Sequence, residues 1–599
     1  MKFTAIGSMI QNMRTEKSTI TRKKLAYGLC SEQTLFGIET GQCDADVLLL
    51  DILMQRMGES PDKFEMILNA EMYNMVRLRD LWEKSILRGK RRLAELILRE
   101  YPSRTNVDQM YRNRMKASML YHMDRNLAGV SQYLQNAIFI TLPGFTYDRM
   151  ESYLISAVEM ENLLALEKTE MEKTSELASL KEIKSHLEFC MNYINLHFEG
   201  DEEHSKLCSK CSWLLARIYY RDGDYIQACA CCERGLECLR RNTQSYFMLP
   251  LLKLMTASEE RLGIAAAQSK WVQYDQILTF LWERYVPKWC PVDSMFHNCY
   301  QRIYHLDYEL IRAERGAKGM SQEALADGVY KNAASLSRLE NGKVSSSKKT
   351  FEGLMRNLGL EKGRYNGYVV TDSLEVLDFP RKLDSAIMRS DFKGAREILE
   401  RLKNNLDMDN VANKFAVQLY ETIIAARLNE FTGEKALEKQ LVLLRGIMDF
   451  DRSGFRHIPM RNEVLLVNSV CKLFGDSECK KEEGIHLAKY TLELFRNSRV
   501  DVRHQYLSYA ILLSNYVHYA REYEAAVEAL RNEMICGKAS ELIFCLNNML
   551  IIMQGNWPKE ECRKWAKAIY YMSDLYYFVK EKQIYGDFLK EKCYEEILD

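Results

Sequence analysis

The chain repeats itself at a spacing of about 300 residues, and this repeat limits its architecture more than any other feature. Leu25-Ala26 recurs as Leu325-Ala326, an offset of 300. After one extra residue in the second copy the offset becomes 301, and it holds for Glu39 and Glu340, Gly41 and Gly342, Met57-Gly58 and Leu358-Gly359, and Phe64 and Tyr365. Two longer segments, 85–98 and 214–228, match 386–399 and 512–526 at offsets of 301 and 298. A nearly constant offset predicts a tandem duplication, with its seam at the proline-containing stretch 286–293.

The composition predicts a long helical protein with several domains. At 599 residues the chain exceeds one ordinary domain. Its nine prolines and 29 glycines are few for that length, which favours uninterrupted helices. Apolar residues make up 47% of the chain, too many for a disordered protein. The formal net charge of +0 excludes a global attraction to nucleic acid or membrane, so any nucleic-acid site must be a local patch.

The sequence favours a cytoplasmic location. Residues 1–14 lack the apolar core of a signal peptide. No apolar run is long enough to span a bilayer, so we expect no membrane partner. Seventeen cysteines without an export signal are typical of reduced, mostly buried thiols.

Residues 311–359 of the second copy contain the clearest motif. Apolar residues recur there at helical spacings. Ser321 is a good N-cap for a helix that starts at Gln322, and Asn332 can cap the next helix. Gly342 stands where a left-handed C-cap would end that second helix.

This stretch resembles the Xre/Cro family of lambda-repressor-like helix-turn-helix domains. The resemblance rests on residue types and spacing together, at Arg312, Arg315, Ser321-Gln322-Glu323, Leu325-Ala326, Leu336 and Arg338-Leu339-Glu340-Asn341-Gly342-Lys343. It implies that the helix opened by Asn332 lies in the major groove of DNA, while the preceding helix rests its N-terminus on phosphate.

The resemblance also implies a role for each DNA-binding candidate of this head. Those residues are Ser321 and Gln322 at the backbone and the adjoining base, Asn332 and Arg338 at base edges, and Asn341 and Lys343 on phosphates. Ala333-Ala334 departs from the family, in which long polar groups are common, so direct readout there is expected to be thin. Residues 301–365 hold 12 Lys/Arg against eight Asp/Glu, and this positive balance favours phosphate contact.

The first copy keeps the same motif spacing over residues 6–58, but its residues that would face DNA are less suited to binding it. Its candidate DNA-binding residues are Thr21, Arg22, Lys23, Ser31 and Gln33. Glu32 stands where relatives often have arginine, and a carboxylate that faces phosphates lowers affinity unless it accepts from cytosine. Residues 1–65 hold eight Lys/Arg against nine Asp/Glu. Two alternatives therefore remain: this head binds DNA, or it is a pseudo-head used for pairing.

The remainder of each copy is expected to be a helical-repeat body. Segments 215–236 and 509–530 carry small and aromatic residues at the spacing of tetratricopeptide-type repeats, which stack into a concave groove suited to a peptide or a helix. The predicted fold class is all-α, with two lambda-repressor-like helix-turn-helix domains, each followed by an α-solenoid of tetratricopeptide-like helix pairs. The expected domains are 1–65, 66–292, 300–365 and 366–599.

A lambda-repressor-like head followed by such repeats resembles the RRNPP group, the peptide-responsive regulators of Gram-positive bacteria. The resemblance implies that a short secreted peptide binds the groove and biases head placement. Asparagine amides can clamp a peptide backbone, and the candidates are Asn192, Asn195, Asn515, Asn547 and Asn548. Each is also explained as a solvated polar residue. Two heads on one chain depart from the usual single-head pattern.

Two cysteine pairs, Cys208-x2-Cys211 and Cys229-x2-Cys232, match the spacing of a four-cysteine zinc site. Both pairs fall on expected helices without a Gly or Pro knuckle, so core packing explains them better, and we expect no metal and no cofactor. There is no glycine-rich phosphate loop, nucleophile elbow or His-Glu-x-x-His motif, so we expect no enzymatic activity.

Together these patterns predict a sequence-specific DNA-binding transcriptional regulator whose helical repeats sense a ligand. Its expected partners are double-stranded DNA and a short signalling peptide or partner protein. The duplicated chain would act as a pseudo-dimer, with a further homodimer left open, and its unlike heads predict an asymmetric operator. The alternative is a protein-interaction scaffold or sensor whose heads serve docking, with DNA binding secondary.

Overall fold

The computed structural model describes residues 3–591, except for 17–19, 44, 199–201, 291, 297–301, 360–368, 372, 450–453, 456–458, 478 and 555–556. Helices dominate the described residues, as the composition predicted. None of these helices combines the length and apolarity that a membrane crossing requires. The expected domain boundaries at residues 300 and 365 lie outside the described residues.

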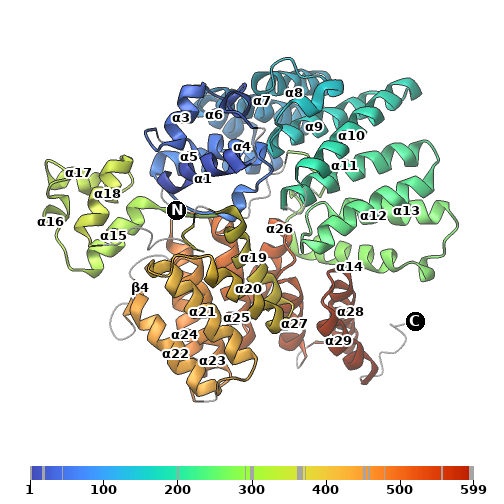
Figure 1. The fold of residues 1–599 in the computed structure, drawn as a ribbon. Coiled ribbons are helices and arrows are strands. Elements are labelled where there is room, and N and C mark those ends of the chain that lie inside the picture. The colour runs from blue at the N-terminus through green and yellow to red at the C-terminus, as the bar shows by residue number, and fades with distance from the viewer. Residues whose placement is uncertain are drawn as a thin grey trace.

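The described part of the first half, within residues 3–285, contains a four-helix unit, a short strand and ten further α-helices (Figure 1). The four-helix unit contains α1 (Phe3–Glu16), α2 (Arg22–Ala26), α3 (Glu32–Glu39) and α4 (Val47–Arg56), and β1 (Glu65–Leu68) follows. The ten helices are α5 (Ala70–Leu87), α6 (Arg91–Glu100), α7 (Asn106–Met119), α8 (Leu127–Thr141), α9 (Ala157–Lys173), α10 (Leu177–His197), α11 (Glu202–Arg221), α12 (Tyr225–Arg241), α13 (Met248–Arg261) and α14 (Lys270–Tyr285).

The second half, residues 303–591, places its strand before the four-helix unit. It begins with β2 (Ile303–Leu306), α15 (Asp307–Ala317), α16 (Gln322–Ala326), α17 (Ala333–Glu340) and α18 (Lys348–Asn357). The body contains α19 (Leu374–Met388), α20 (Phe392–Asn404), α21 (Val411–Arg427), α22 (Gly433–Ile447), the hairpin of β3 (Met448–Asp449) and β4 (Gly454–Phe455), α23 (Arg461–Gly475), α24 (Lys481–Asn497), α25 (Tyr506–Ala520), α26 (Tyr523–Cys536), α27 (Leu542–Met553), α28 (Lys559–Leu575) and α29 (Val579–Glu591).

Tight turns fall at matching positions in the two halves. The turn from α5 to α6 uses Gly89 at φ 68°, and the turn from α19 to α20 uses Ser390 at φ 59°, which lies 301 residues later. Gly223 at φ 78° and Arg521 at φ 55°, 298 residues apart, turn the chain from α11 to α12 and from α25 to α26. Left-handed backbone is uncommon outside glycine. These turns therefore join corresponding helix pairs in the two bodies, α5–α6 with α19–α20 and α11–α12 with α25–α26.

The two halves pack against each other through contacts that come in matching pairs. Arg240 on α12 donates from Nε to the backbone oxygen of Leu575, the last residue of α28, at 2.7 Å. Arg531 on α26 donates from Nε to the backbone oxygen of Tyr285, the last residue of α14, at 3.2 Å. Each arginine thus satisfies a carbonyl at the end of a helix in the other half.

The loops before α13 and α27 meet each other directly. Gln244 and Lys538 form an antiparallel bridge. On its two sides, Ser245 N donates to Gly537 O at 3.0 Å and Ala539 N donates to Thr243 O at 2.8 Å. Equivalent loops of the two bodies therefore share one hydrogen-bonded seam.

The hydrophobic cores also cross the boundary between the halves. One cluster joins buried side chains of 117–296 with those of 419–589, and a second joins 9–158 with 304–500. Strands β1 and β2 pair in parallel, with Glu65 opposite Ile303 and Leu68 opposite Leu306. The two halves consequently pack together as one unit with shared hydrophobic cores.

The two four-helix units attach to the helical bodies in different ways. On α4, Arg56 pairs with Glu159 of α9 at 2.5 Å, and both side chains are at most 1% exposed. Helices α15 to α18 project from the body at the left of Figure 1. Their contact with the second body includes Glu309, whose carboxylate accepts from Ser498 Oγ at 2.9 Å and from Arg499 N at 3.0 Å.

Candidate nucleic-acid interface

Helices α16 and α17 are built by the caps that the sequence predicted. The Ser321 hydroxyl oxygen accepts from Ala324 N at 3.1 Å, and Asn332 Oδ1 accepts from Ser335 N at 3.0 Å. Gly342 follows α17 with φ 66°, the left-handed conformation expected of its C-cap glycine. The sequence therefore predicted both starts and the end of this helix pair.

A buried carboxylate holds the helix pair to the helix before it. Glu340 at the end of α17 pairs with Arg315 of α15, Oε1 to Nε, at 2.5 Å. Its Oε2 accepts from Gln322 Nε2 at 2.6 Å. The Glu340 side chain is only 3% exposed. The single acidic residue of α17 is thus matched internally.

The outer face of α17 carries exposed polar and cationic side chains. Arg338 on this helix is exposed, and so are Asn332 at its N-cap, Lys331 before it and Lys343 after it. Ala334, between the two predicted base-reading residues, is exposed as well. The structure therefore places Asn332, Arg338 and Lys343 on a surface that a DNA duplex could reach.

Besides the capping residues Ser321 and Asn332, Gln322 and Asn341 also make contacts within the protein. Gln322 is half-buried, with its amide on Glu340. Asn341 Nδ2 donates to Ser337 O at 2.7 Å, and the Asn341 backbone oxygen accepts from Arg499 Nη1 at 3.1 Å. Asn341 thereby links the end of α17 to the second body.

The base of this unit contains a buried acid, Asp307, which is 3% exposed. Ser346 Oγ donates to one carboxylate oxygen, and Tyr308 N donates to the other at 2.7 Å. Burial, opposed by these two hydrogen bonds, raises the pKa of Asp307 to about 6.

The N-terminal unit repeats the same internal construction. Glu39 pairs with Arg14 Nε and with Arg22 Nε, both at 2.6 Å. Arg14 and Glu39 lie 301 residues before Arg315 and Glu340. In the sequence, Glu39 and Glu340 marked the repeat and Glu340 also the family resemblance, but their role as organising carboxylates was not predicted. The sequence signal for this role is the recurrence of an arginine, Arg14 and Arg315, at the same offset.

The predicted DNA-binding residues of the N-terminal unit lie at the starts of α2 and α3. Thr21 caps α2 by accepting from Lys24 N at 3.1 Å, and Ser31 caps α3 by accepting from Thr34 N at 3.0 Å. Lys23 and Gln33 are exposed, whereas Arg22 is half-buried on Glu39. Glu32, which precedes Gln33 at the start of α3, is exposed, so its carboxylate faces solvent beside these candidate residues.

The five asparagines predicted to bind a peptide are not gathered at one site. Asn515 Nδ2 donates to Asn468 O at 3.0 Å, Asn548 Nδ2 donates to Ser514 O at 2.9 Å, and Asn547 Oδ1 accepts from Tyr585 OH. Asn195 Oδ1 lies 3.2 Å from His204 Nε2. Asn192 is exposed on α10. At least three of these amides bridge neighbouring helices of the second body.

Each body contains an open cavity. In the first, a cavity of about 390 Å³ lies between α8, α9 and α10 and is lined in part by Phe139, Tyr147 and His186. In the second, a cavity of about 440 Å³ lies between α21, α22 and α23. Its wall includes Val411 and Val442, which are 55% and 64% exposed, so it presents apolar surface to solvent.

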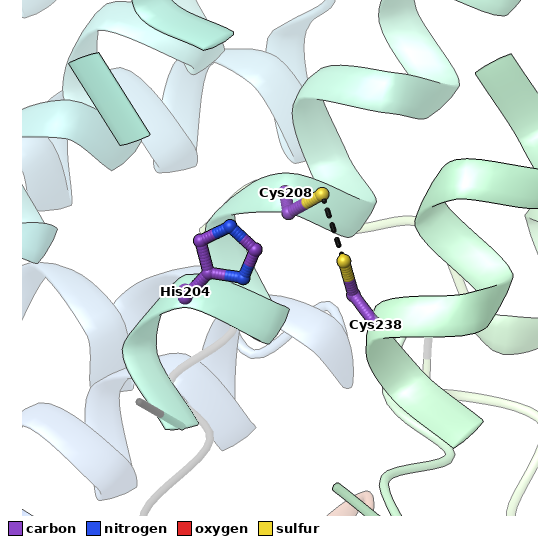
Figure 2. A group of neighbouring side chains, drawn as sticks. All are labelled: His204, Cys208 and Cys238. Atoms are coloured by element: carbon purple, nitrogen blue, oxygen red, sulfur yellow. Dashed lines mark hydrogen bonds between the residues drawn. The ribbon is translucent and has the colours of Figure 1, made fainter. Parts of the chain in front are cut away.

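The predicted cysteine pairs lie within α11 and α12, as expected. Burial raises the pKa of the Cys211 and Cys232 thiols well above its ordinary value, which suits core packing. Among the described residues, the metal-type ligand atoms that converge belong to another set, His204, Cys208 and Cys238 (Figure 2).

Comparison with known proteins matches one part of the chain to a family model. A helix-turn-helix family model matches residues 311–363, so this segment is a helix-turn-helix domain. The crystal structure of Bacillus thuringiensis PlcR in complex with the peptide PapR7 and DNA overlaps 47% of this chain and 98% of PlcR, with 13% identity and a TM-score of 0.31. A search of curated proteins finds no match.

Proposed function

We propose that this chain is a cytoplasmic, sequence-specific transcriptional regulator that binds double-stranded DNA through α16 and α17. The observation that carries the proposal is the outer face of α17. Asn332, Arg338 and Lys343 are exposed there, while Glu340, the one acid of the helix, is matched by Arg315 and Gln322. A helix with this surface suits the major groove, because its cations meet phosphates and guanine without an opposing carboxylate.

We further propose that the chain arose by tandem duplication and acts as a covalent pseudo-dimer. Support comes from the shared helix order, the matching left-handed turns and the repeated arginine–glutamate pairs. The N-terminal unit would then be a second helix-turn-helix domain. Because Glu32 is exposed beside its groove-facing residues, this unit contributes less affinity, and the operator is asymmetric.

The helical bodies are proposed to bind a short peptide that alters head placement. The supporting feature is the cavity beside Val411 and Val442, whose exposed apolar surface suits a hydrophobic peptide side chain. No enzymatic role is proposed, since the exposed polar residues of α17 suit binding to DNA.

A salt titration of the purified chain on mixed genomic DNA fragments, with sequencing of the retained DNA, tests the proposed function. Phosphate contacts make affinity fall steeply as salt rises, and base contacts enrich one motif. A steep salt dependence with one enriched, asymmetric motif supports the regulator. Retention that ignores salt, or that enriches no sequence, would favour the alternative of a docking scaffold, to which the exposed Glu32 lends some support.

A further inference from the structure

Three metal-type ligands converge where the helices α11 and α12 lie side by side. His204 and Cys208 are one turn apart on α11, and Cys238 comes from the last turns of α12 (Figure 2). Their ligand atoms all lie within 4.8 Å of one another, and the Cys238 thiol donates to Cys208 Sγ at 3.2 Å. Cys208 is buried, whereas His204 and Cys238 are half-buried, so the cluster is reachable from solvent.

The surroundings of the cluster suit metal binding. Asn195 Oδ1 lies 3.2 Å from His204 Nε2, so a proton on Nε2 leaves the Nδ1 lone pair for a metal. A bound cation would favour the thiolate form of both cysteines, because a metal binds the deprotonated sulfur.

We propose that His204, Cys208 and Cys238 bind a zinc ion with one coordination position left for water or an external ligand. Two thiolates and an imidazole are ligands that Zn²⁺ prefers, and three protein ligands with an open fourth position form a known type of zinc site. Tetrahedral Zn–S bonds of about 2.3 Å separate two sulfurs by about 3.8 Å. The 3.2 Å between Cys208 Sγ and Cys238 Sγ must widen only slightly to admit the ion.

The location of this site connects it to the seam between the halves. Glu202, two residues before His204, pairs with Arg381 and with Lys538 of the second half. Two residues after Cys238, Arg240 donates to Leu575 O. The ion would thus join the start of α11 to the end of α12 at the point where both helices hold the other half. Zinc binding is therefore expected to tighten the seam at Gln244.

The test uses the full-length chain, reduced and stripped with a chelator, then titrated with Zn²⁺ against a chromophoric chelator and with Co²⁺. Wild type is expected to bind one equivalent, and bound Co²⁺ to show thiolate charge-transfer absorption. Cys238→Ser and His204→Gln, both at half-buried positions, are expected to abolish this binding. Asn195→Ala is expected to weaken it about 10- to 100-fold while keeping the cobalt spectrum.

Cys229→Ser is the matched control, because Cys229 is a half-buried cysteine on the same helix outside the cluster. Zinc binding that survives Cys238→Ser and His204→Gln would overturn the site. Absence of zinc binding by reduced wild type, or uptake of Cu⁺ alone, would overturn it too. Zinc is also expected to slow amide exchange at 537–541 in wild type and Cys229→Ser. Unchanged exchange with zinc bound would reject the link to the seam.

Discussion

Arg315 Nε on α15 lies 2.5 Å from Glu340 Oε1 on α17, and this ion pair holds α17 to α15 within the helix-turn-helix domain. Arg14 and Glu39 form the equivalent pair in the N-terminal unit at 2.6 Å. In each unit a second side chain also contacts this carboxylate. Gln322 contacts Glu340, and Arg22 contacts Glu39. The orientation of α17 therefore depends on one buried acid.

Glu340→Gln should destabilise α15 to α18 and weaken binding to every DNA sequence. The change removes the charge that Arg315 faces, and breaking a buried ion pair is costly. Arg315 is 20% exposed, so we expect a loss of about 2 kcal/mol. Hydrogen exchange of residues 307–357 measures it. Glu323→Gln, an exposed acid of the same domain, is the control, and equal exchange in the two variants would contradict the role of Glu340.

Arg338→Ala and Lys343→Ala should affect DNA binding in different ways. Loss of Arg338 is expected to cost about 1–3 kcal/mol at mainly one base pair, because a guanidinium reads guanine in the groove. Loss of Lys343 should weaken binding to all sequences and reduce the salt slope by about one. Binding to the selected operator and to random DNA separates these effects, with Lys393→Ala on the exposed surface of α20 as control. Identical losses on both DNAs would refute the assigned roles.

Glu32→Lys should raise the affinity for DNA if the N-terminal unit lies against a second half-site. The exposed carboxylate at the start of α3 would become a cation and add about one phosphate contact to the salt slope. Glu100→Lys, an exposed acid on α6, makes the same change in net charge elsewhere. Equal affinities for the two variants would indicate that the N-terminal unit does not face DNA.

Arg240→Ala should loosen the seam between the halves. The buried guanidinium donates to Leu575 O and Asp574 O, and its loss removes the side-chain donor that satisfies Leu575 O, at a cost of about 1–3 kcal/mol. Faster amide exchange at the end of α28 would report this. Arg241→Ala is the control, because its side chain is 74% exposed. Protection that is equal in both variants would argue against the proposed contribution of Arg240.

The stability of the helix-turn-helix domain should depend on pH because of Asp307. Its folded pKa of about 6 lies above its ordinary 3.8, so the folded state binds a proton more tightly than the unfolded state. The stability from this group is complete below about pH 4 and is lost as the pH rises through about 6, by at most about 3 kcal/mol. Stability of residues 307–357 in wild type and Asp307→Asn should therefore diverge over that range. Asp327→Asn, an exposed acid, should follow wild type. Parallel profiles for wild type and Asp307→Asn would disprove the effect.

Local signals in the sequence predicted the elements that local chemistry determines. Ser321 and Asn332 are caps as expected, and Gly342 has the expected positive φ. Contacts that depend on how distant segments pack could not be predicted. Arg240 and Leu575 are 335 residues apart, and nothing in their neighbours marks either one.

The metal-type cluster shows the same limit on a smaller scale. Cys208 was singled out because it begins a Cys-x2-Cys pair, yet its sulfur meets Cys238 rather than Cys211. That pairing depends on the register of α11 against α12, which spacing along the chain does not reveal. Asn195 is a candidate peptide-binding residue, and its contact with His204 could not be predicted from the sequence.

The seam at Gln244 and Lys538 has a consequence for gene dosage. A repressor that must first pair with a second chain fills its operator in proportion to the square of its concentration while it is dilute. In this molecule the second half is already held in place, so the proposed two half-sites would be filled in proportion to the first power of concentration. The output of the proposed regulator would then change in proportion to its expression level.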